Sequence, residues 1–269
     1  MRAGPTYTGT VLTVKYIGRD TMLENIKQRK YAVGEGVTAV WNGEDYSIEL
    51  YSDGGTLWWD WMNKGQTMFI EIESIRVAKG SKVYLPENMS GADRRGMYRG
   101  FGGLPWVSRI DMNGFDTSKV KNMRGMFENC SALEEISLNG CNVSNVETVQ
   151  DMFRGCNNLR HIDLSGTDLS KVTRTDNMFF ECESLTEVDV SPLYSASITR
   201  MDYMFYKCQK IKEIDLSGFD MSNVQDISHM FGYCTDLQKI TMQTTILSGT
   251  KTEGIFEKCP QNLLIQCPE

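Results

Sequence analysis

The sequence is poor in the residues on which most enzyme sites depend. Only two histidines occur among the 269 residues, His161 and His229, and they occupy different positions relative to the repeated motif described below. No G-x-S-x-G nucleophile motif, phosphate-binding P-loop or dinucleotide-binding glycine pattern is present. We therefore expect a protein that is not an enzyme and that uses no cofactor.

Long apolar runs and an excess of positive charge are also missing. No run of about 18 apolar residues exists, which excludes membrane insertion by this chain. The net charge of −7 argues against nucleic acid as a partner. The first residues lack the apolar core of a signal peptide, so the chain is either a trimmed form or part of something assembled without secretion. A hydrophobic content of 41% still indicates a globular protein of one or two domains.

The chain contains a strong internal repeat. The pair Met-Phe recurs every 26 residues, and a cysteine follows three residues after each Phe. A shorter last copy has Ile255-Phe256 and Cys259. A period between 20 and 50 residues indicates stacked supersecondary units. The residues expected to form the core of the repeats are Phe127, Cys130, Phe153, Cys156, Phe179, Cys182, Phe205, Cys208, Phe231 and Cys234.

The spacing of apolar residues changes within each repeat. Ile136 and Leu138 step by two, which predicts a short strand. Ser144 and Glu147 then match the capping box that begins a helix. The following apolar residues step by three and four, which predicts one helical face: Val146, Val149, Phe153 and Cys156. The sequence therefore predicts an α/β solenoid whose turns each contain a short parallel strand and a short helix.

The full motif, M-F-x-x-C-x-x-L-x-x-I-D-L-S-G-F-D, resembles the bacterial surface protein A-like leucine-rich repeats, of the 26-residue type also found in mycoplasma lipoproteins. The resemblance covers roughly residues 101–267 and implies a leucine-rich-repeat solenoid of about seven turns. It also implies an extracellular, non-enzymatic binding or adhesion protein, without supplying a ligand. Some copies depart from the motif: Ser191-Pro192 replaces Ser-Gly, and Ala196 replaces the capping serine.

Three regions are expected along the chain. Residues 1–66 carry no repeat, and alternating residues such as Tyr46, Ile48 and Leu50 predict a small β-rich N-terminal domain, with a hairpin turn at residues 53–55. Residues 67–100 are expected to form an irregular capping turn. Residues 101–269 form the solenoid, with residues 263–267 as its C-terminal cap.

Two sets of residues are candidates for binding. One is a row of changing side chains at a single strand position: Arg109, Glu135, His161, Glu187, Glu213 and Lys239. Solenoids present extended binding surfaces in this way, although a solvated charged face is the simpler alternative. The other set is the cluster Trp58, Trp59 and Trp61, which forms either an exposed platform for a sugar or protein, or part of the core.

The cysteine and aspartate columns are the candidate metal sites of the sequence. The cysteines lack C-x-x-C spacing and are interpreted as reduced core residues, with pairing of Cys259 and Cys267 left open. Asp111, Asp163, Asp189 and Asp215 recur at one strand position, with Ser137 and Thr241 completing the column. They either bind Ca²⁺ or a basic partner, or hydrogen-bond to neighbouring backbone. The second interpretation is favoured because calcium needs ligands from several directions, and no metal site is predicted.

The sequence as a whole predicts a non-enzymatic recognition or adhesion protein of a bacterium, located outside the cell or on its surface. Its partner would be a protein or glycan of a host or neighbouring cell, bound on the exposed face of the solenoid. The alternative is a structural or receptor-binding component of a fibre or tail-like particle. The oligomeric state is left open.

Overall fold

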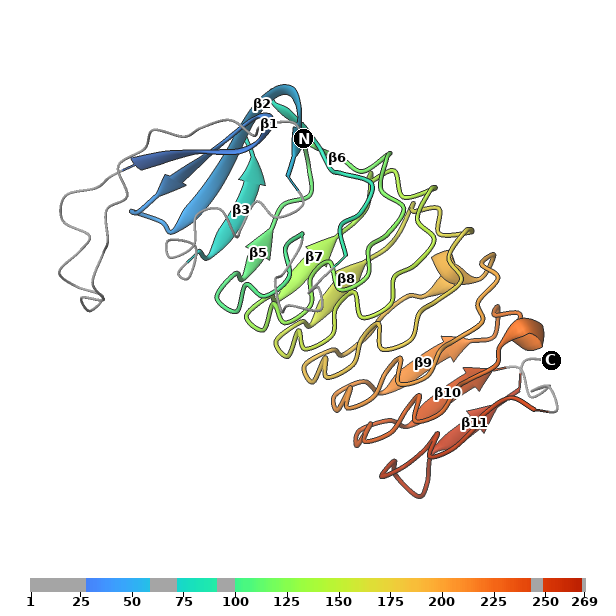
Figure 1. The fold of residues 1–269 in the computed structure, drawn as a ribbon. Coiled ribbons are helices and arrows are strands. Elements are labelled where there is room, and N and C mark those ends of the chain that lie inside the picture. Colours follow the sequence, from blue (N-terminus) through green and yellow to red (C-terminus); the bar gives the residue numbers. More distant parts are fainter. Residues whose placement is uncertain (1–27, 59–71, 91–99, 243–248, 268–269) are drawn as a thin grey trace, which may run out of the picture.

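The chain winds into a coil of about seven turns whose parallel strands lie side by side along one wall (Figure 1). This computed structural model describes residues 28–58, 72–90, 100–242 and 249–267. The first strands are β1 Gln28–Asn42, β2 Ser47–Leu57, β3 Ser74–Val77, β4 Lys82–Tyr84, β5 Arg109–Ile110 and β6 Phe115–Asp116. The later strands are β7 Glu135–Ser137, β8 His161–Asp163, β9 Glu213–Leu216, β10 Lys239–Met242 and β11 Leu264–Gln266.

The long strand β2 joins the N-terminal hairpin to the solenoid. One edge of β2 pairs antiparallel with β1, and it also pairs in parallel with β3 through residues 47–50 and with β4 through residues 53–56. The order β6-β4-β2-β3-β5-β7-β8 makes one sheet with β1, and β9, β10 and β11 make a second. The predicted strand from Tyr46 to Leu50 is therefore present. The predicted hairpin turn at residues 53–55 is wrong, because these residues lie inside β2 and the chain reverses at residues 43–46.

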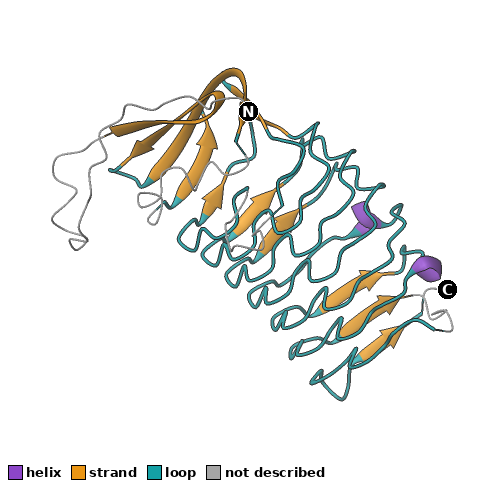
Figure 2. Cartoon of the chain, in the orientation of Figure 1, coloured by secondary structure: helices purple, strands orange, loops and turns teal. Residues whose placement is uncertain are grey.

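The predicted helix in each repeat is also wrong. Within the described ranges the only helices are two 3-10 turns of three residues each, η3 Ser191–Leu193 and η4 Met221–Asn223 (Figure 2). The chain is a parallel β-solenoid, not an α/β solenoid. Where the helix was expected, alternate amides donate to carbonyls of the next turn: Val149 to Arg174, Asp151 to Asp176 and Phe153 to Met178, at 2.9–3.2 Å.

Left-handed residues explain why no helix forms. Asp151 and Gly155 have φ values of 55° and 72°, and their equivalents Asn177 and Glu181 have 56° and 61°. A left-handed residue at every fourth position turns the chain out of a right-handed helix. The side chains spaced by three and four still point inward, because the segment curves as an arc around the core. The hydrogen bonds that a helix would make within itself instead join neighbouring turns.

A second ladder runs along this wall, which we call the bridge wall. Single β-bridges join one residue of each turn to the next: Asn88, Asn122, Thr148, Arg174, Arg200, Asp226 and Lys251. The solenoid is thus tied together on the bridge wall as well as in the sheet.

The core between the walls is a set of columns. Each phenylalanine ring stacks on the ring of the next turn, with centroids 5.3–5.8 Å apart from Phe101 to Phe256. Each column cysteine donates its thiol to the carbonyl of the phenylalanine one turn earlier, as from Cys182 Sγ to Phe153 O at 3.2 Å. The ten core residues expected from the motif are all fully buried. At the C-terminal end, the three residues of β11 are exposed. The three domain boundaries expected from the sequence stay predictions.

Candidate recognition surface on the sheet

The row of changing side chains predicted from the repeat lies on the outer face of the sheet. Arg109 pairs in register with Glu135, Glu135 with His161, and Glu213 with Lys239. The following residue in each strand is buried, as Ile136 is at 4% exposure and Ile214 at 2%. The side chains of the row therefore face outward, where all are exposed except Lys239, which is half-buried.

The sheet is interrupted at one place in this row. Residues 187–190 occupy the strand position between β8 and β9, but form no strand. Within the described ranges, no backbone hydrogen bond joins residues 187–189 to β8 or β9. In the preceding turns, by contrast, the amide of Leu138 donates to Asp163 O at 2.8 Å.

Pro192 accounts for the interruption. After the strand, the equivalent residues Gly140 and Gly166 have φ values of 82° and 69°. Proline is fixed near −65° and cannot adopt this left-handed turn. The chain instead leaves the strand position through η3, with Pro192 in its first turn and Leu193 buried.

The side chain of Tyr194 bonds to a backbone carbonyl that a continuous sheet would use as an acceptor. Its hydroxyl donates to Asp215 O at 3.0 Å, which is the position to which an amide of the ladder would donate. Its ring lies against Gly218, where an added Cβ would be 1.9 Å from Tyr194 Cδ2. The ring also meets Phe219 edge to face, with centroids 5.1 Å apart. Tyr194 therefore holds the two turns in an arrangement that keeps the sheet open.

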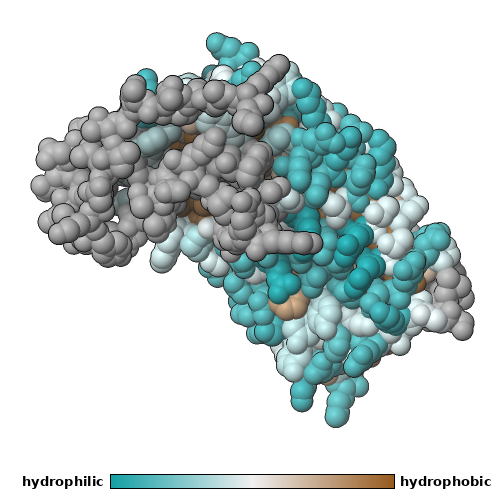
Figure 3. Space-filling view, viewed as in Figure 1, coloured by the Kyte–Doolittle hydropathy of each residue, from teal (hydrophilic) through white to brown (hydrophobic). Residues whose placement is uncertain are grey.

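The opening forms a depression of about 650 Å³ on the sheet face. Four of the six predicted row residues line it: His161, Glu187, Glu213 and Lys239. Arg109 and Glu135 lie further along the same row and do not line it. Side chains on the visible face of the described turns are mainly hydrophilic (Figure 3), and the depression is lined by polar side chains around a floor that includes Val188 and Ile162.

Carboxylates dominate the lining. Asp163, Asp189 and Asp215 join Glu187 and Glu213, against the single cation Lys239 and the side chain of His161. His161 Nδ1 lies 3.7 Å from Glu187 Oε1. Hydrogen bonds from Ser165, together with one from Ser137, hold the pKa of Asp163 below its usual value. This carboxyl is therefore ionised at neutral pH.

The aspartate column also has a local structural role. One oxygen of each aspartate accepts the backbone N–H two residues later, at 2.8–3.0 Å: Asp111 from Asn113, Asp163 from Ser165, Asp189 from Ser191 and Asp215 from Ser217. These bonds cap the chain where it leaves the strand position. Ser137 does the same for Asn139 at 3.1 Å. In the described ranges, no group of three or more His, Cys, Asp or Glu side chains is arranged to hold a metal ion.

The tryptophan cluster is only partly described. Trp58 is half-buried and packs against the core, with its amide donating to Val33 O at 3.0 Å. Trp59 and Trp61 lie outside the described residues. The binding role proposed for the cluster stays a prediction.

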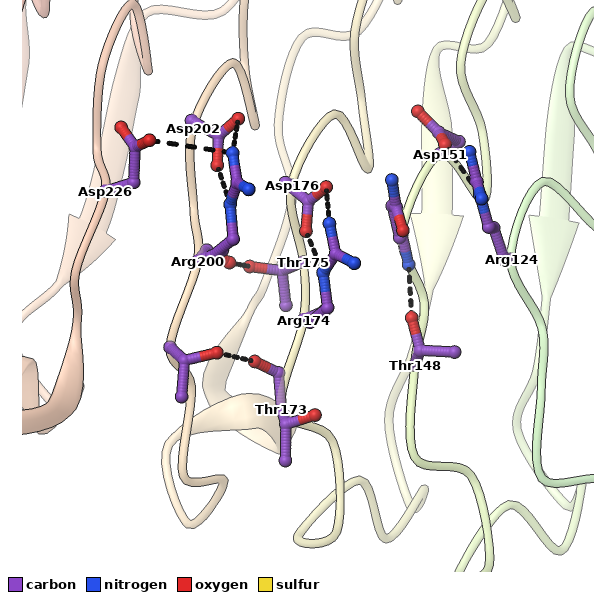
Figure 4. Close-up of polar contacts among 12 residues, drawn as sticks. Arg124, Thr148, Asp151, Thr173, Arg174, Thr175, Asp176, Arg200, Asp202 and Asp226 are labelled. Carbon is purple, nitrogen blue, oxygen red and sulfur yellow. Dashed lines mark hydrogen bonds and ion pairs between the residues drawn. The ribbon is translucent and has the colours of Figure 1, made fainter.

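A polar row on the bridge wall was not anticipated from the sequence (Figure 4). Arg174 and Arg200 each make two hydrogen bonds to the aspartate two residues later, Asp176 and Asp202, at 2.8–2.9 Å. Both aspartates are buried, so each arginine neutralises a charge that would otherwise be costly to bury. The hydrogen bond to Asp202 raises the pKa of Arg200. The R-x-D spacing in two successive repeats is the signal that could have revealed these pairs.

All eight cysteines are free thiols, including Cys259 and Cys267. Burial raises the pKa of Cys130 to about 12, so the column thiols are protonated and unreactive. In the described part of the chain, no helix is long and apolar enough to cross a bilayer.

Comparisons with solved structures give distant similarities. A leucine-rich repeat protein from Eubacterium ventriosum is 13% identical, with a TM-score of 0.28, and the match covers 88% of this chain and 99% of that one. The Toll–Spätzle complex of Drosophila matches at 10% identity and a TM-score of 0.24, over 94% of this chain and 44% of that chain. At such scores these similarities carry no argument about function. No curated protein matches the chain.

Two overlapping stretches, residues 96–192 and 158–264, match a family described as "Mycoplasma protein of unknown function, DUF285". Together they span most of the solenoid and more than half of the chain. The chain belongs to this family.

Proposed function

We propose that the chain is a non-enzymatic recognition protein, of the bacterial surface protein A-like repeat type, that binds a partner protein through the outer face of its sheet. The observation that carries the proposal is the depression over residues 187–190. It lies on a row of exposed side chains that change from turn to turn, while the core columns stay constant. A constant scaffold with a variable outer row is how solenoid proteins form extended binding surfaces.

The depression also has a suitable size. Its volume of about 650 Å³ lies within the range of roughly 300–1,000 Å³ seen for ligand sites. It therefore has room for a few side chains of a partner. We place this activity outside a bacterial cell, in keeping with the resemblance of the repeat to surface proteins.

The test is an array of bacterial and host surface proteins and glycans probed with the full chain. Hits would be measured again with the variant Glu187→Ala/Glu213→Ala, which removes two carboxylates from the sheet face. The matched control, Glu147→Ala/Glu253→Ala, removes two exposed carboxylates beside the bridge wall. Loss of a protein hit with the first variant alone supports the proposal. Hits confined to glycans, or equal binding by both variants, would contradict it.

A further inference from the structure

The depression has two independent features that together indicate what occupies it. One is its charge, and the other is a floor whose backbone groups lack partners in the sheet. Carboxylates alone would not identify a ligand, because a solvated acidic face has the same composition. The interrupted ladder adds hydrogen-bonding groups that a folded β-solenoid normally satisfies.

The middle of the floor is formed by residues 187–189. Within the described ranges, no backbone hydrogen bond is made by the N–H or C=O groups of these three residues. The flanking strands β8 and β9 form no ladder with these residues, and on β9 the carbonyl of Asp215 accepts from the Tyr194 hydroxyl instead. An incoming main chain can supply the missing donors and acceptors, as extended peptides do when they bind at open edges of sheets.

The rim supplies charge on both sides of this floor. Asp163 lies on the β8 side, Glu187 and Asp189 lie over the opening, and Glu213 and Asp215 lie on the β9 side. One oxygen of Asp189 and one of Asp215 are used for local turns. The second oxygens have no hydrogen bond within the described part of the chain. Lysine and arginine side chains are the complement of such a rim.

The dimensions favour an extended occupant. The floor residues 187–189 occupy a strand position, so an occupant that pairs with them lies parallel or antiparallel to the strands. Three residues at about 3.3 Å each give a paired length of about 10 Å. The lining residues of β8 and β9 then lie on either side of this occupant. Alternate side chains of such a segment would point toward the same rim.

We propose that this depression binds an extended segment of a partner protein that carries lysine or arginine side chains. The inference rests on the proposed function, because it names the class of partner for the same surface. The backbone of the segment pairs with residues 187–189, and its cationic side chains meet the carboxylates of the rim.

The test uses the full chain and three labelled peptides with alternating sequences: Lys-Ser, Glu-Ser and Gly-Ser. Fluorescence anisotropy should show binding of the Lys-Ser peptide that weakens as salt is raised. The variant Glu187→Lys/Glu213→Lys should weaken this binding about tenfold or more, because two attractive contacts become repulsive. The control Glu147→Lys/Glu253→Lys makes the same change in net charge beside the bridge wall, and should leave binding within about twofold of the original. All four glutamates are exposed, so unchanged thermal melting is expected for both variants.

Other outcomes separate this inference from the proposed function. Equal weakening by both pairs of substitutions would overturn the inference, because it would mean that only overall charge matters. Binding of the Glu-Ser or Gly-Ser peptide at the sheet face would overturn the basic class of partner and leave sheet-face recognition standing. A third outcome is that no peptide binds, while Glu187→Ala/Glu213→Ala still abolishes binding of the array partner. It would likewise overturn the basic class of partner and leave sheet-face recognition standing. If neither peptides nor array partners respond to sheet-face variants, both proposals fail.

Discussion

At the scale of single residues, the phenylalanine column is the main source of order in this molecule. Phe153 is fully buried and its ring lies between those of Phe127 and Phe179, at centroid distances of 5.3 and 5.8 Å. The planes are nearly parallel, as in offset stacking. Each ring therefore contributes to two interfaces between turns.

Replacing Phe153 by Ala should lower the free energy of unfolding by about 3–5 kcal/mol, as for other buried aromatic side chains. Both neighbouring turns lose a packing surface, so the effect should exceed that of the same change at Phe256, which has a neighbouring ring on one side only. Urea denaturation followed by circular dichroism measures both variants. Equal losses at the two positions would contradict the two-sided role of Phe153.

The thiols provide a second prediction at this scale. The five column cysteines, Cys130 to Cys234, are fully buried, whereas Cys267 is exposed. Burial also raises the pKa of Cys141 and Cys259, both half-buried. In the native protein, Cys267 should react with Ellman's reagent first, and the column should stay unreactive until denaturant is added.

All eight cysteines should then react. If only six thiols reacted in denaturant without reductant, a disulfide between Cys259 and Cys267 would be indicated. That result would contradict the free thiols of the structure. Rapid reaction of the column thiols in the native state would show that the core is open to solvent.

At the scale of elements, the strands of most repeats were predictable from the sequence, but the helices it predicted do not form. Alternation at Ile136 and Leu138 correctly identified β7, because a sheet with one buried face requires a period of two. Spacing of three and four at Val149 and Phe153 is also satisfied by an arc containing left-handed residues. A sequence pattern reports which side chains face the core, and here it could not distinguish the two backbones that put them there. Glu181, Lys207 and Tyr233 have φ values of 60–62°. None of them is a glycine, so the sequence gave no indication of the left-handed backbone at these positions.

The link between the N-terminal hairpin and the solenoid provides a pH-dependent prediction. Lys82 on β4 meets Asp116 on β6 at 2.7 Å. Burial acts to raise the pKa of Asp116, but hydrogen bonds from Lys82 and Ser118 prevail and lower it to about 2. The folded pKa thus lies below the unfolded value of about 3.9. The unfolded state then binds more protons between about pH 4 and 2, so the stabilisation is present above this range and is lost as pH falls through it.

The variant Asp116→Asn should therefore be less stable than the original chain at pH 6, by about 1 kcal/mol or less, because solvent around the exposed Lys82 side chain screens the pair. The difference should shrink as the pH falls from 4 toward 2. Urea denaturation at several pH values measures it, with Asp236→Asn as a control at an exposed aspartate. A difference that is independent of pH would mean that packing rather than ionisation explains the loss.

At the scale of the whole molecule, the repeat predicts the scaffold, and the departures from the repeat form the depression. The 26-residue period was enough to predict a solenoid, its buried columns and its outer row. The depression depends on two exceptions, Pro192 in place of a left-handed glycine and Tyr194 reaching Asp215 O in the next turn. The Ser191-Pro192 departure was visible in the sequence. The loss of strand pairing that follows from this departure could not be predicted. It depends on the contact of the Tyr194 ring with Gly218, and therefore on how two neighbouring turns are spaced.

The interruption affects only one wall of the solenoid, and this has a measurable consequence. In the same turn, the amide of Phe179 donates to Met204 O at 2.9 Å, and the phenylalanine column continues without a gap. The amides of residues 187–189 should therefore exchange with deuterium at nearly unprotected rates. The amides of Phe179 and Phe205 should exchange slowly, through larger unfolding events.

Mass spectrometry of peptides from the exchanged protein distinguishes this arrangement from its alternative. If the open sheet divided the solenoid into two units that unfold separately, Phe179 would exchange much faster than its counterpart Phe153, and urea unfolding would have two phases. We expect one transition, because each turn contacts its neighbours through the bridge wall and the core as well as through the sheet. Protection of residues 187–189 should then rise when a partner is bound, while that of Phe179 stays the same. The solenoid would in that case act as a rigid support for an opening confined to its outer face.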